Sequence, residues 1–251
     1  SENNLDKYYA SDNYISHTNK PNTLTNKLYK IARRFTLQRK LNLINKLQDK
    51  DTILDYGCGT GEFLNTCQNN GWQITGVEPN QVAREQANTI NNNRVFPSLD
   101  SVEDKSKFKI ITLWHVLEHI PQLNDTLKKL RKLLHKNGTM IVAVPNCESY
   151  DAQLYKEFWA GYDLPRHLYH FTPKTLKKLM KRHKLKVRDI IPMPLDSYYI
   201  SLLSQQYMSV ENDDKAGVSN YIKSIINGYK SNSYAEKHQN NHSSLMYIIS
   251  K

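Results

Sequence analysis

The stretch DTILDYGCGTG at residues 51–61 constrains this chain more than any other part of its sequence. An apolar pair at 53–54 predicts a buried strand that ends at a carboxylate, Asp55. Three glycines then follow at alternate positions: Gly57, Gly59 and Gly61. Because glycine has no Cβ, this loop can turn sharply and lie against a ligand. A helix is expected next, and the strand, glycine loop and helix together are typical of nucleotide sites in open α/β sheets.

The spacing of these glycines argues against two common nucleotide-binding motifs. A dinucleotide loop needs its third glycine three residues after the second, but Gly61 comes two after Gly59. The Lys-Ser/Thr pair of a phosphate-binding P-loop is missing as well. Glu78 ends the next apolar stretch, where an acidic side chain can accept hydrogen bonds from ribose hydroxyls. The same carboxylate could instead cap the following helix.

Several motifs resemble the class I S-adenosylmethionine-dependent methyltransferases. DYGCGTG (55–61) followed by GVEPN (76–80) resembles their cofactor motif, and 108–122 and 137–146 resemble their fourth and fifth strands. DLPRHLYHFTP (163–173) is similar to small-molecule methyltransferases akin to the ubiquinone-biosynthesis O-methyltransferases. The resemblance implies an α/β, Rossmann-like seven-stranded sheet with helices on both faces. It also implies S-adenosylmethionine as the cofactor.

The same resemblance implies where the cofactor binds, along the carboxyl edge of the first two strands. The glycines approach the methionine part and ribose, Asp55 orients the loop or the ammonium, and Glu78 holds the ribose hydroxyls. The expected cofactor-binding residues are Asp55, Gly57, Cys58, Gly59, Gly61, Glu78, Pro79, Leu99, Asp100, Trp114, His115, Tyr14 and His17. Tyr14 and His17 belong to an N-terminal segment that we expect to fold over the cofactor as a lid.

Alternating apolar patterns predict the order of the elements. Strands are expected near 52–56, 73–77, 94–96, 108–113, 138–144, 185–191 and 244–250. Helices are expected near 22–48, 61–69, 80–90 and 121–135, the last stopped by Asn137-Gly138, and another begins at Thr172-Pro173. The predicted organisation is an N-terminal helical lid segment at 1–48 and a methyltransferase domain at 49–251. Cap insertions are expected at about 147–172 and 195–240, the second before the last strand.

The net charge and the cysteine content indicate which partners and which cellular location suit this chain. The formal net charge is +11, which suits a nucleic-acid surface, although solvated helix faces explain the same excess. No apolar run is long enough for membrane insertion, and no signal peptide is recognised. Three cysteines without metal-type spacing favour free thiols and a cytoplasmic location. The oligomeric state stays open.

Three histidines are candidates for catalysis. His115 follows the fourth strand, whereas His167 and His170 lie in the aromatic insertion at 147–172. Each could also be a structural histidine that bonds to loop backbone. We expect one of the pair, with His167 favoured, to face the acceptor as a general base or anchor and the other to hold the loop.

One motif suggests a different chemistry. His115, Glu118 and His119 match the H-x-x-E-H pattern of inverted zinc peptidases. That pattern needs a continuous helix, and Pro121 together with the preceding strand argues against one. The expected site is therefore free of metal.

The expected function is methyl transfer from S-adenosylmethionine to a small molecule, at oxygen by the resemblance. An RNA methyltransferase that uses the basic surface is the alternative. A second alternative is a protein that binds the S-adenosyl ligand without transferring its methyl group.

Overall fold

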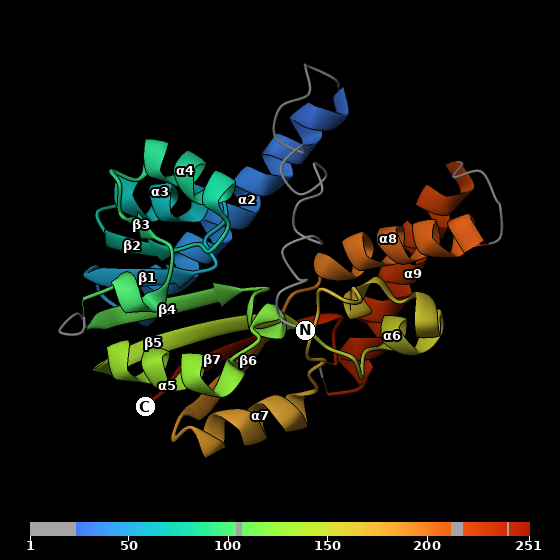
Figure 1. Ribbon diagram of the computed structural model, residues 1–251. Helices are drawn as coiled ribbons and strands as arrows, with labels where there is room; N and C mark the ends of the chain where they lie inside the picture. Colours follow the sequence, from blue (N-terminus) through green and yellow to red (C-terminus); the bar gives the residue numbers. More distant parts are fainter. Residues whose placement is uncertain (1–23, 104–106, 212–217, 240) are drawn as a thin grey trace. The chain divides into compact units, whose positions relative to one another are not determined.

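The computed structural model describes residues 24–103, 107–211, 218–239 and 241–251, in two compact units (Figure 1). The described part of the first unit runs to Trp114 and adds Asn124–Met140 and Lys251. The second comprises His115–Leu123 and Ile141–Ser250. The predicted lid residues Tyr14 and His17 lie outside the described residues. The predicted boundary near residue 48 stays a prediction.

The first unit alternates strands with helices. Its elements are α2 (Leu24–Leu47), β1 (Thr52–Tyr56), α3 (Glu62–Asn69), β2 (Gln73–Val77), α4 (Gln81–Ile90), β3 (Val95–Phe96), the 3-10 turn η3 (Leu99–Ser101), β4 (Phe108–Trp114), α5 (Leu123–Leu133) and the start of β5 (Leu134–Pro145). Helix α3 packs against β2 and α4 against β3, beside each other in Figure 1. Their buried side chains follow the helical period, as with Phe63, Leu64 and Cys67 on α3.

The second unit is built mostly from segments after β5. They are α6 (Tyr150–Tyr155), the 3-10 turns η5 (Lys156–Phe158) and η6 (Ala160–Tyr162), α7 (Pro173–Arg182), β6 (Lys186–Pro192), α8 (Asp196–Glu211), α9 (Val218–Lys237) and β7 (Ser244–Ser250). The turn η4 (Leu117–His119) also belongs here. Thr172 caps α7 through a capping box with Thr175, which explains why Thr172-Pro173 predicted the helix start.

The seven strands form one sheet in the order β3-β2-β1-β4-β5-β7-β6. β1 pairs in parallel with β2 and β4, and β2 pairs in parallel with β3. β7 runs antiparallel to β6. The strands of the parallel part are almost continuously buried, for example Ile53, Leu54 and Asp55 in β1. The predicted Rossmann-like sheet is confirmed.

The junction between α5 and β5 differs from the sequence prediction. The helix ends at Leu133, and the strand begins at Leu134 instead of near 138. Asn137-Gly138 therefore lies inside the strand and does not stop a helix. A Cβ on Gly138 would lie 2.8 Å from the carbonyl oxygen of Phe108, so this glycine serves the close approach of two backbones.

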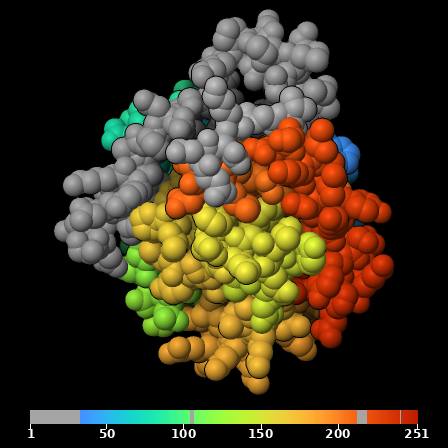
Figure 2. All heavy atoms as spheres, turned by 90° about the vertical axis from the view of Figure 1, so that its right-hand side faces the viewer, coloured from blue at the N-terminus to red at the C-terminus, as the bar shows by residue number. Residues whose placement is uncertain are grey.

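The insertion before β7 is a pair of helices, as expected for residues 195–240. Helices α8 and α9 pack along each other and contact α6. Figure 2 shows this face of the second unit, with the segment around α6 in yellow bordered by α8 and α9 in orange to red. Among the helices that the structure describes, none combines the length and apolarity needed to cross a membrane.

Candidate functional site

The glycine loop between β1 and α3 adopts the conformation that its glycines allow. Gly57, Gly59 and Gly61 have φ angles of 75°, 54° and 78°, in the left-handed region that L side chains rarely adopt. An added Cβ at Gly59 would meet no atom within 4 Å, whereas at Gly61 it would lie 2.2 Å from Asn91 Nδ2. Gly61 thus serves packing against α4, and the backbone at Gly59 is open to a ligand.

Glu78 lies beside this loop, directly after β2. Its side-chain oxygens accept hydrogen bonds from the backbone N–H groups of Gly59 (2.8 Å) and Asn80 (2.9 Å). Each carboxylate oxygen has two acceptor positions, so both retain one for a hydroxyl group. An open glycine backbone beside a carboxylate with acceptor capacity fits the ribose and methionine parts of S-adenosylmethionine. Gly59 and Glu78 could therefore hold this cofactor.

Asp55 lies beneath the loop and is only 2% exposed. The Thr112 hydroxyl on β4 donates a hydrogen bond to Asp55 Oδ1 at 2.6 Å. Burial raises the pKa of Asp55 to about 7, and the bond from Thr112 opposes this only in part. Because Asp55 is bonded to the neighbouring strand, it supports the loop from below. Its expected contact with the cofactor ammonium stays a prediction.

The other predicted cofactor residues of the first unit surround the ends of the strands. Leu99 is buried in η3, and its neighbour Asp100 forms an ion pair with Lys129 at 2.6 Å. Cys58 donates its backbone N–H to the Val77 carbonyl oxygen at 3.2 Å. Pro79 accepts a hydrogen bond from Arg84, whose guanidinium also bonds the Glu78 carbonyl oxygen. These contacts fix the backbone that follows β1 and β2.

Trp114 is the last residue of β4. The Lys40 ammonium lies 4.2 Å from the centre of its ring, and Phe63 meets it edge-on at 5.5 Å. Its buried indole Nε1 has no hydrogen-bond partner among the described residues. A buried donor without a partner is rare in folded proteins, so this N–H is available to a ligand.

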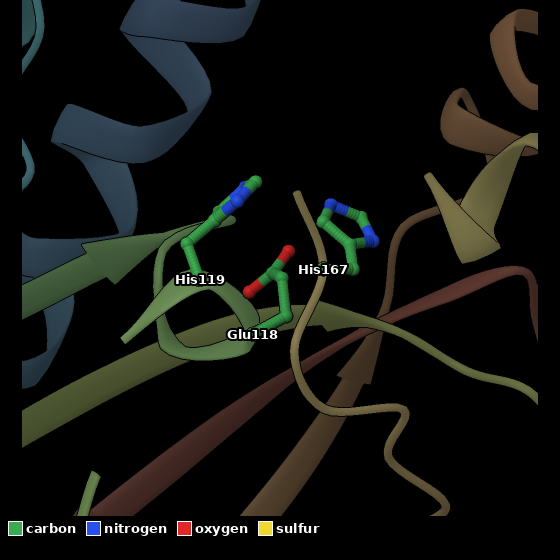
Figure 3. Close-up of side chains that lie close together, drawn as sticks. All are labelled: Glu118, His119 and His167. Atoms are coloured by element: carbon green, nitrogen blue, oxygen red, sulfur yellow. The ribbon is translucent and has the colours of Figure 1, made fainter. Parts of the chain in front are cut away.

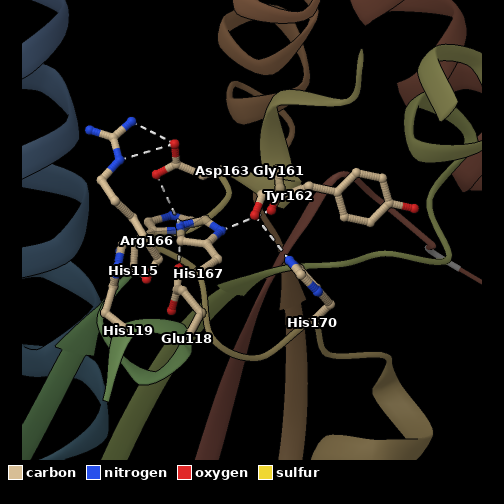
Figure 4. Close-up of polar contacts among 9 residues, drawn as sticks. All are labelled: His115, Glu118, His119, Gly161, Tyr162, Asp163, Arg166, His167 and His170. Carbon is tan, nitrogen blue, oxygen red and sulfur yellow. Dashed lines mark hydrogen bonds and ion pairs between the residues drawn. The ribbon is translucent and has the colours of Figure 1, made fainter. Parts of the chain in front are cut away.

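His115, the first residue after β4, lies between two carboxylates. Its Nε2 is 3.1 Å from Asp196 Oδ2 at the start of α8. Its Nδ1 is 3.6 Å from Glu118 Oε1, and these two residues are labelled in Figure 4. Burial opposes the charged ring, but Asp196 and Glu118 outweigh it and raise the pKa of His115 to about 10. His115 is therefore an imidazolium at neutral pH and has no lone pair with which to act as a base.

His167 and His170 both contact the carbonyl groups of η6. His167 Nδ1 lies 2.8 Å from the Gly161 oxygen, and His170 Nε2 lies 3.0 Å from the Tyr162 oxygen. Burial lowers the pKa of His167, whose side chain is 10% exposed, so its ring is neutral at physiological pH. The segment that holds them is a loop with a turn and not a helix, and their ring centres lie 6.4 Å apart.

A narrow pocket, too tight in this structure to admit a water molecule, lies beside these two histidines within the second unit. It is lined by Pro145, Cys147, Trp159, Gly161, His167, Tyr169 and His170. Trp159 is fully buried and donates its indole N–H to Asp151 at 2.8 Å. Gly161 packs on the Trp159 ring, where an added Cβ would lie 2.4 Å from a ring atom. The aromatic insertion thus positions the carbonyl that holds His167.

The H-x-x-E-H pattern does not form the helix that an inverted zinc peptidase needs. His115 ends the strand with a φ of 55°, and Leu117–His119 is a single 3-10 turn. Glu118 and His119 instead meet His167, so that one possible ligand atom from each lies within 4.8 Å of the others. Figure 3 shows the Glu118 carboxylate between the two imidazole rings.

Sequence reasoning gave no site role to the two carboxylates that flank the histidines. Asp196 lies far along the chain from His115. Asp163 lies directly before a turn that contains Pro165. Asp163 binds the Arg166 guanidinium at 2.5 Å and lies 3.7 Å from His167 Nε2. The contact of Asp196 with His115 joins segments that only folding brings together, whereas Asp163 meets partners three and four residues further along the chain.

The sheet order and the glycine loop after β1 define the class of a Rossmann-like α/β protein. A family model described as "Methyltransferase domain" matches residues 29–190, more than half of the chain. The chain belongs to this methyltransferase family. The family expected from the motifs is confirmed.

Curated relatives and solved structures agree with this membership. The ubiquinone biosynthesis O-methyltransferase of Bradyrhizobium diazoefficiens is 26% identical over 114 residues, which cover 43% of this chain and 44% of that protein. The one from Pseudomonas paraeruginosa is 26% identical over 166 residues, which cover 59% and 71%. The chain thus spans less than half of the first relative's length.

The similar structures show the fold. A SAM-dependent methyltransferase from Archaeoglobus fulgidus has a TM-score of 0.56 at 21% identity, covering 87% of this chain and 94% of that one. A cyclopropane synthase from Mycobacterium tuberculosis has a TM-score of 0.58 at 12% identity, covering 97% and 95%.

Proposed function

We propose that this enzyme transfers the methyl group of S-adenosylmethionine to a hydroxyl oxygen of a small molecule. The observation that carries the proposal is a neutral imidazole, His167, in an aromatic-lined pocket of the second unit. A ring that is neutral at physiological pH can accept a proton from a hydroxyl group. The two relatives described above are O-methyltransferases by name, which supports oxygen as the accepting atom.

The cofactor side of the proposal rests on the first unit. The bound cofactor supplies an electrophilic methyl group. Gly59 would approach its methionine part, and the Glu78 carboxylate would accept hydrogen bonds from the ribose hydroxyls. Trp114 Nε1, a buried donor with no partner among the described residues, would bond a polar atom of the ligand. These residues bind and orient the donor, and the acceptor pocket needs only to present its nucleophile in line.

The histidines have different tasks in this proposal. The carbonyl oxygen of Gly161 can only accept, so it holds the N–H of His167 on Nδ1 and leaves the lone pair on Nε2. Nε2 is the atom that would take the acceptor's proton. His115, charged and paired with Asp196 and Glu118, would hold the Glu118 carboxylate in place. His170 would hold the loop through Tyr162.

The test is a screen of hydroxylated aromatic compounds with the purified protein, followed by production of S-adenosylhomocysteine. NMR of the product identifies the methylated atom. On an identified acceptor, His167→Ala should lower turnover by about 10²–10⁴-fold, the range for loss of a general base. Cofactor affinity should stay near that of the wild type. Wild-type turnover in His167→Ala would remove this residue from the chemistry.

The same screen tests the two alternatives, an RNA methyltransferase and a protein that binds the S-adenosyl ligand without methyl transfer. RNA is included among the acceptors, because the net charge of +11 suits an anionic partner. Methyl transfer to RNA alone would replace the small-molecule proposal. Cofactor binding without turnover on any acceptor would favour a binding protein.

A further inference from the structure

The cluster of Glu118, His119 and His167 has the composition of a metal site. Glu118 and His119 come from η4, whereas His167 comes from the loop before α7, so folding alone brings them together. One possible ligand atom from each residue lies within 4.8 Å of the other two. His115, which the H-x-x-E-H motif would have used, is not a member.

The Glu118 carboxylate is the first observation that points to a cation. Its side chain is 1% exposed, and neither oxygen has a hydrogen-bond partner among the described residues. The His115 ring at 3.6 Å is close enough to form an ion pair but too distant for a hydrogen bond. Although burial works in the opposite direction, the His115 charge lowers the pKa of Glu118, which is therefore ionised. A buried carboxylate without hydrogen bonds is costly. The ion pair with His115 offsets part of this cost, and both carboxylate oxygens keep lone pairs that a second cation can use.

The orientation of the two imidazoles is the second observation. His119 Nδ1 lies 3.1 Å from the Arg166 carbonyl oxygen, and His167 Nδ1 lies 2.8 Å from that of Gly161. A carbonyl oxygen only accepts, so each Nδ1 carries the hydrogen and each Nε2 carries the lone pair. Metal-binding histidines are oriented in this way, with the second ring nitrogen donating to a backbone carbonyl.

We propose that His119 Nε2, His167 Nε2 and the Glu118 carboxylate bind one divalent transition-metal ion, such as zinc. Two imidazoles and one carboxylate suit zinc or iron better than magnesium, which prefers oxygen ligands. Ligand atoms of a tetrahedral zinc lie about 3.4 Å apart, so these side chains would need to move together by up to about 1.4 Å. Three protein ligands leave a coordination position open for another molecule.

This inference rests on the proposed function where the chemistry is concerned. The acceptor hydroxyl would bind at the open position, where the ion lowers its pKa and its proton passes to solvent. The resulting oxygen anion forms a bond to the methyl carbon, and the bond from that carbon to sulfur breaks with its electron pair left on sulfur. With the ion bound, His167 would be a metal ligand, and the ion would promote loss of the acceptor's proton in place of the His167 base described under the proposed function.

The test is metal binding to the tag-free, full-length protein after treatment with a chelator. Zinc is titrated by calorimetry, and cobalt is followed by its visible d–d absorption, which reports coordination without any need for activity. We expect one equivalent per chain. Glu118→Gln and His167→Gln should each weaken binding by about 100-fold or more, beyond the 10–100-fold typical of residues that only support a ligand. His238→Gln, at an exposed histidine of the second unit outside the cluster, should bind like the wild type.

Circular dichroism and thermal melting establish that each variant is folded before its titration is compared. Absence of stoichiometric binding by folded wild-type protein, or unchanged binding in both ligand variants, overturns the proposal. Methyl transfer to a hydroxyl group at an unchanged rate without metal would overturn the part in proton removal that this inference gives to the ion, and it would leave the proposed function standing. Stoichiometric binding without any methyl transfer would support the metal site and count against the proposed function.

Discussion

Replacing Gly59 by alanine tests whether the open face of the glycine loop is where the cofactor lies. At this position φ is 54°, and an added methyl group would contact no atom of the protein within 4 Å. The left-handed conformation costs an L residue about 1–2 kcal/mol. At about 2–4 °C per kcal/mol for a chain of this size, the melting temperature should fall by about 2–8 °C.

Gly59→Ala should also weaken cofactor binding, in addition to its effect on folding. If the methionine part or ribose lies against Gly59, the methyl group occupies space that the cofactor needs. We expect the dissociation constant for S-adenosylhomocysteine, measured by calorimetry, to rise by about tenfold or more, which corresponds to about 1.4 kcal/mol. The folded protein should otherwise behave like the wild type.

Two other glycines provide matched controls. Gly71 has a φ of 91°, and a Cβ there would be 3.8 Å from its nearest neighbour, Lys50 Cδ. Gly71→Ala should therefore carry a similar folding penalty with no loss of affinity. At Gly61 the added carbon would lie 2.2 Å from Asn91 Nδ2 and 2.9 Å from Ala87 Cβ, so Gly61→Ala should lower the melting temperature further. If folded Gly59→Ala binds the cofactor as well as Gly71→Ala does, the cofactor does not lie over Gly59.

Three further substitutions test the electrostatics of the two units. Glu78→Ala should weaken cofactor binding by about tenfold or more, because bonds to a charged acceptor contribute about 1.5–3 kcal/mol each; the exposed Glu85→Ala is the control, and equal affinities in calorimetry would remove Glu78 from the site. Burial raises the pKa of Asp55 from 3.8 to about 7, so its contribution to stability is present at low pH and is lost as the pH rises between about 4 and 7. Asp55→Asn should therefore gain stability relative to the wild type across that window, and a constant difference in melting temperature would contradict the assignment. Asp196→Asn should lower the pKa of His115 by about 1–3, followed by NMR titration; an unchanged value would show that Asp196 does not hold the imidazolium.

The conformation of the glycine loop and the place of Glu78 beside it could be predicted from the sequence, because their determinants are local. Gly57, Gly59 and Gly61 can adopt positive φ angles wherever they occur, and the loop needs those angles. Glu78 ends a short buried strand, and parallel strands bring their carboxyl ends to one edge. Alternation and helical periodicity likewise predicted the order of strands and helices.

Tertiary structure decided which polar groups meet. Glu118 and His167 are separated along the chain by α5, β5, α6 and the turns η5 and η6. Asp196 reaches His115 from the start of a later helix. The turn that presents His119 has no sequence pattern that specifies a partner. Gly138 shows the same limit, since the residue pair that suggests a helix end instead allows two backbones to approach. Local sterics and periodicity act within a few residues and can be read along the chain, whereas burial, pKa and ligand geometry depend on groups that only the folded packing brings together.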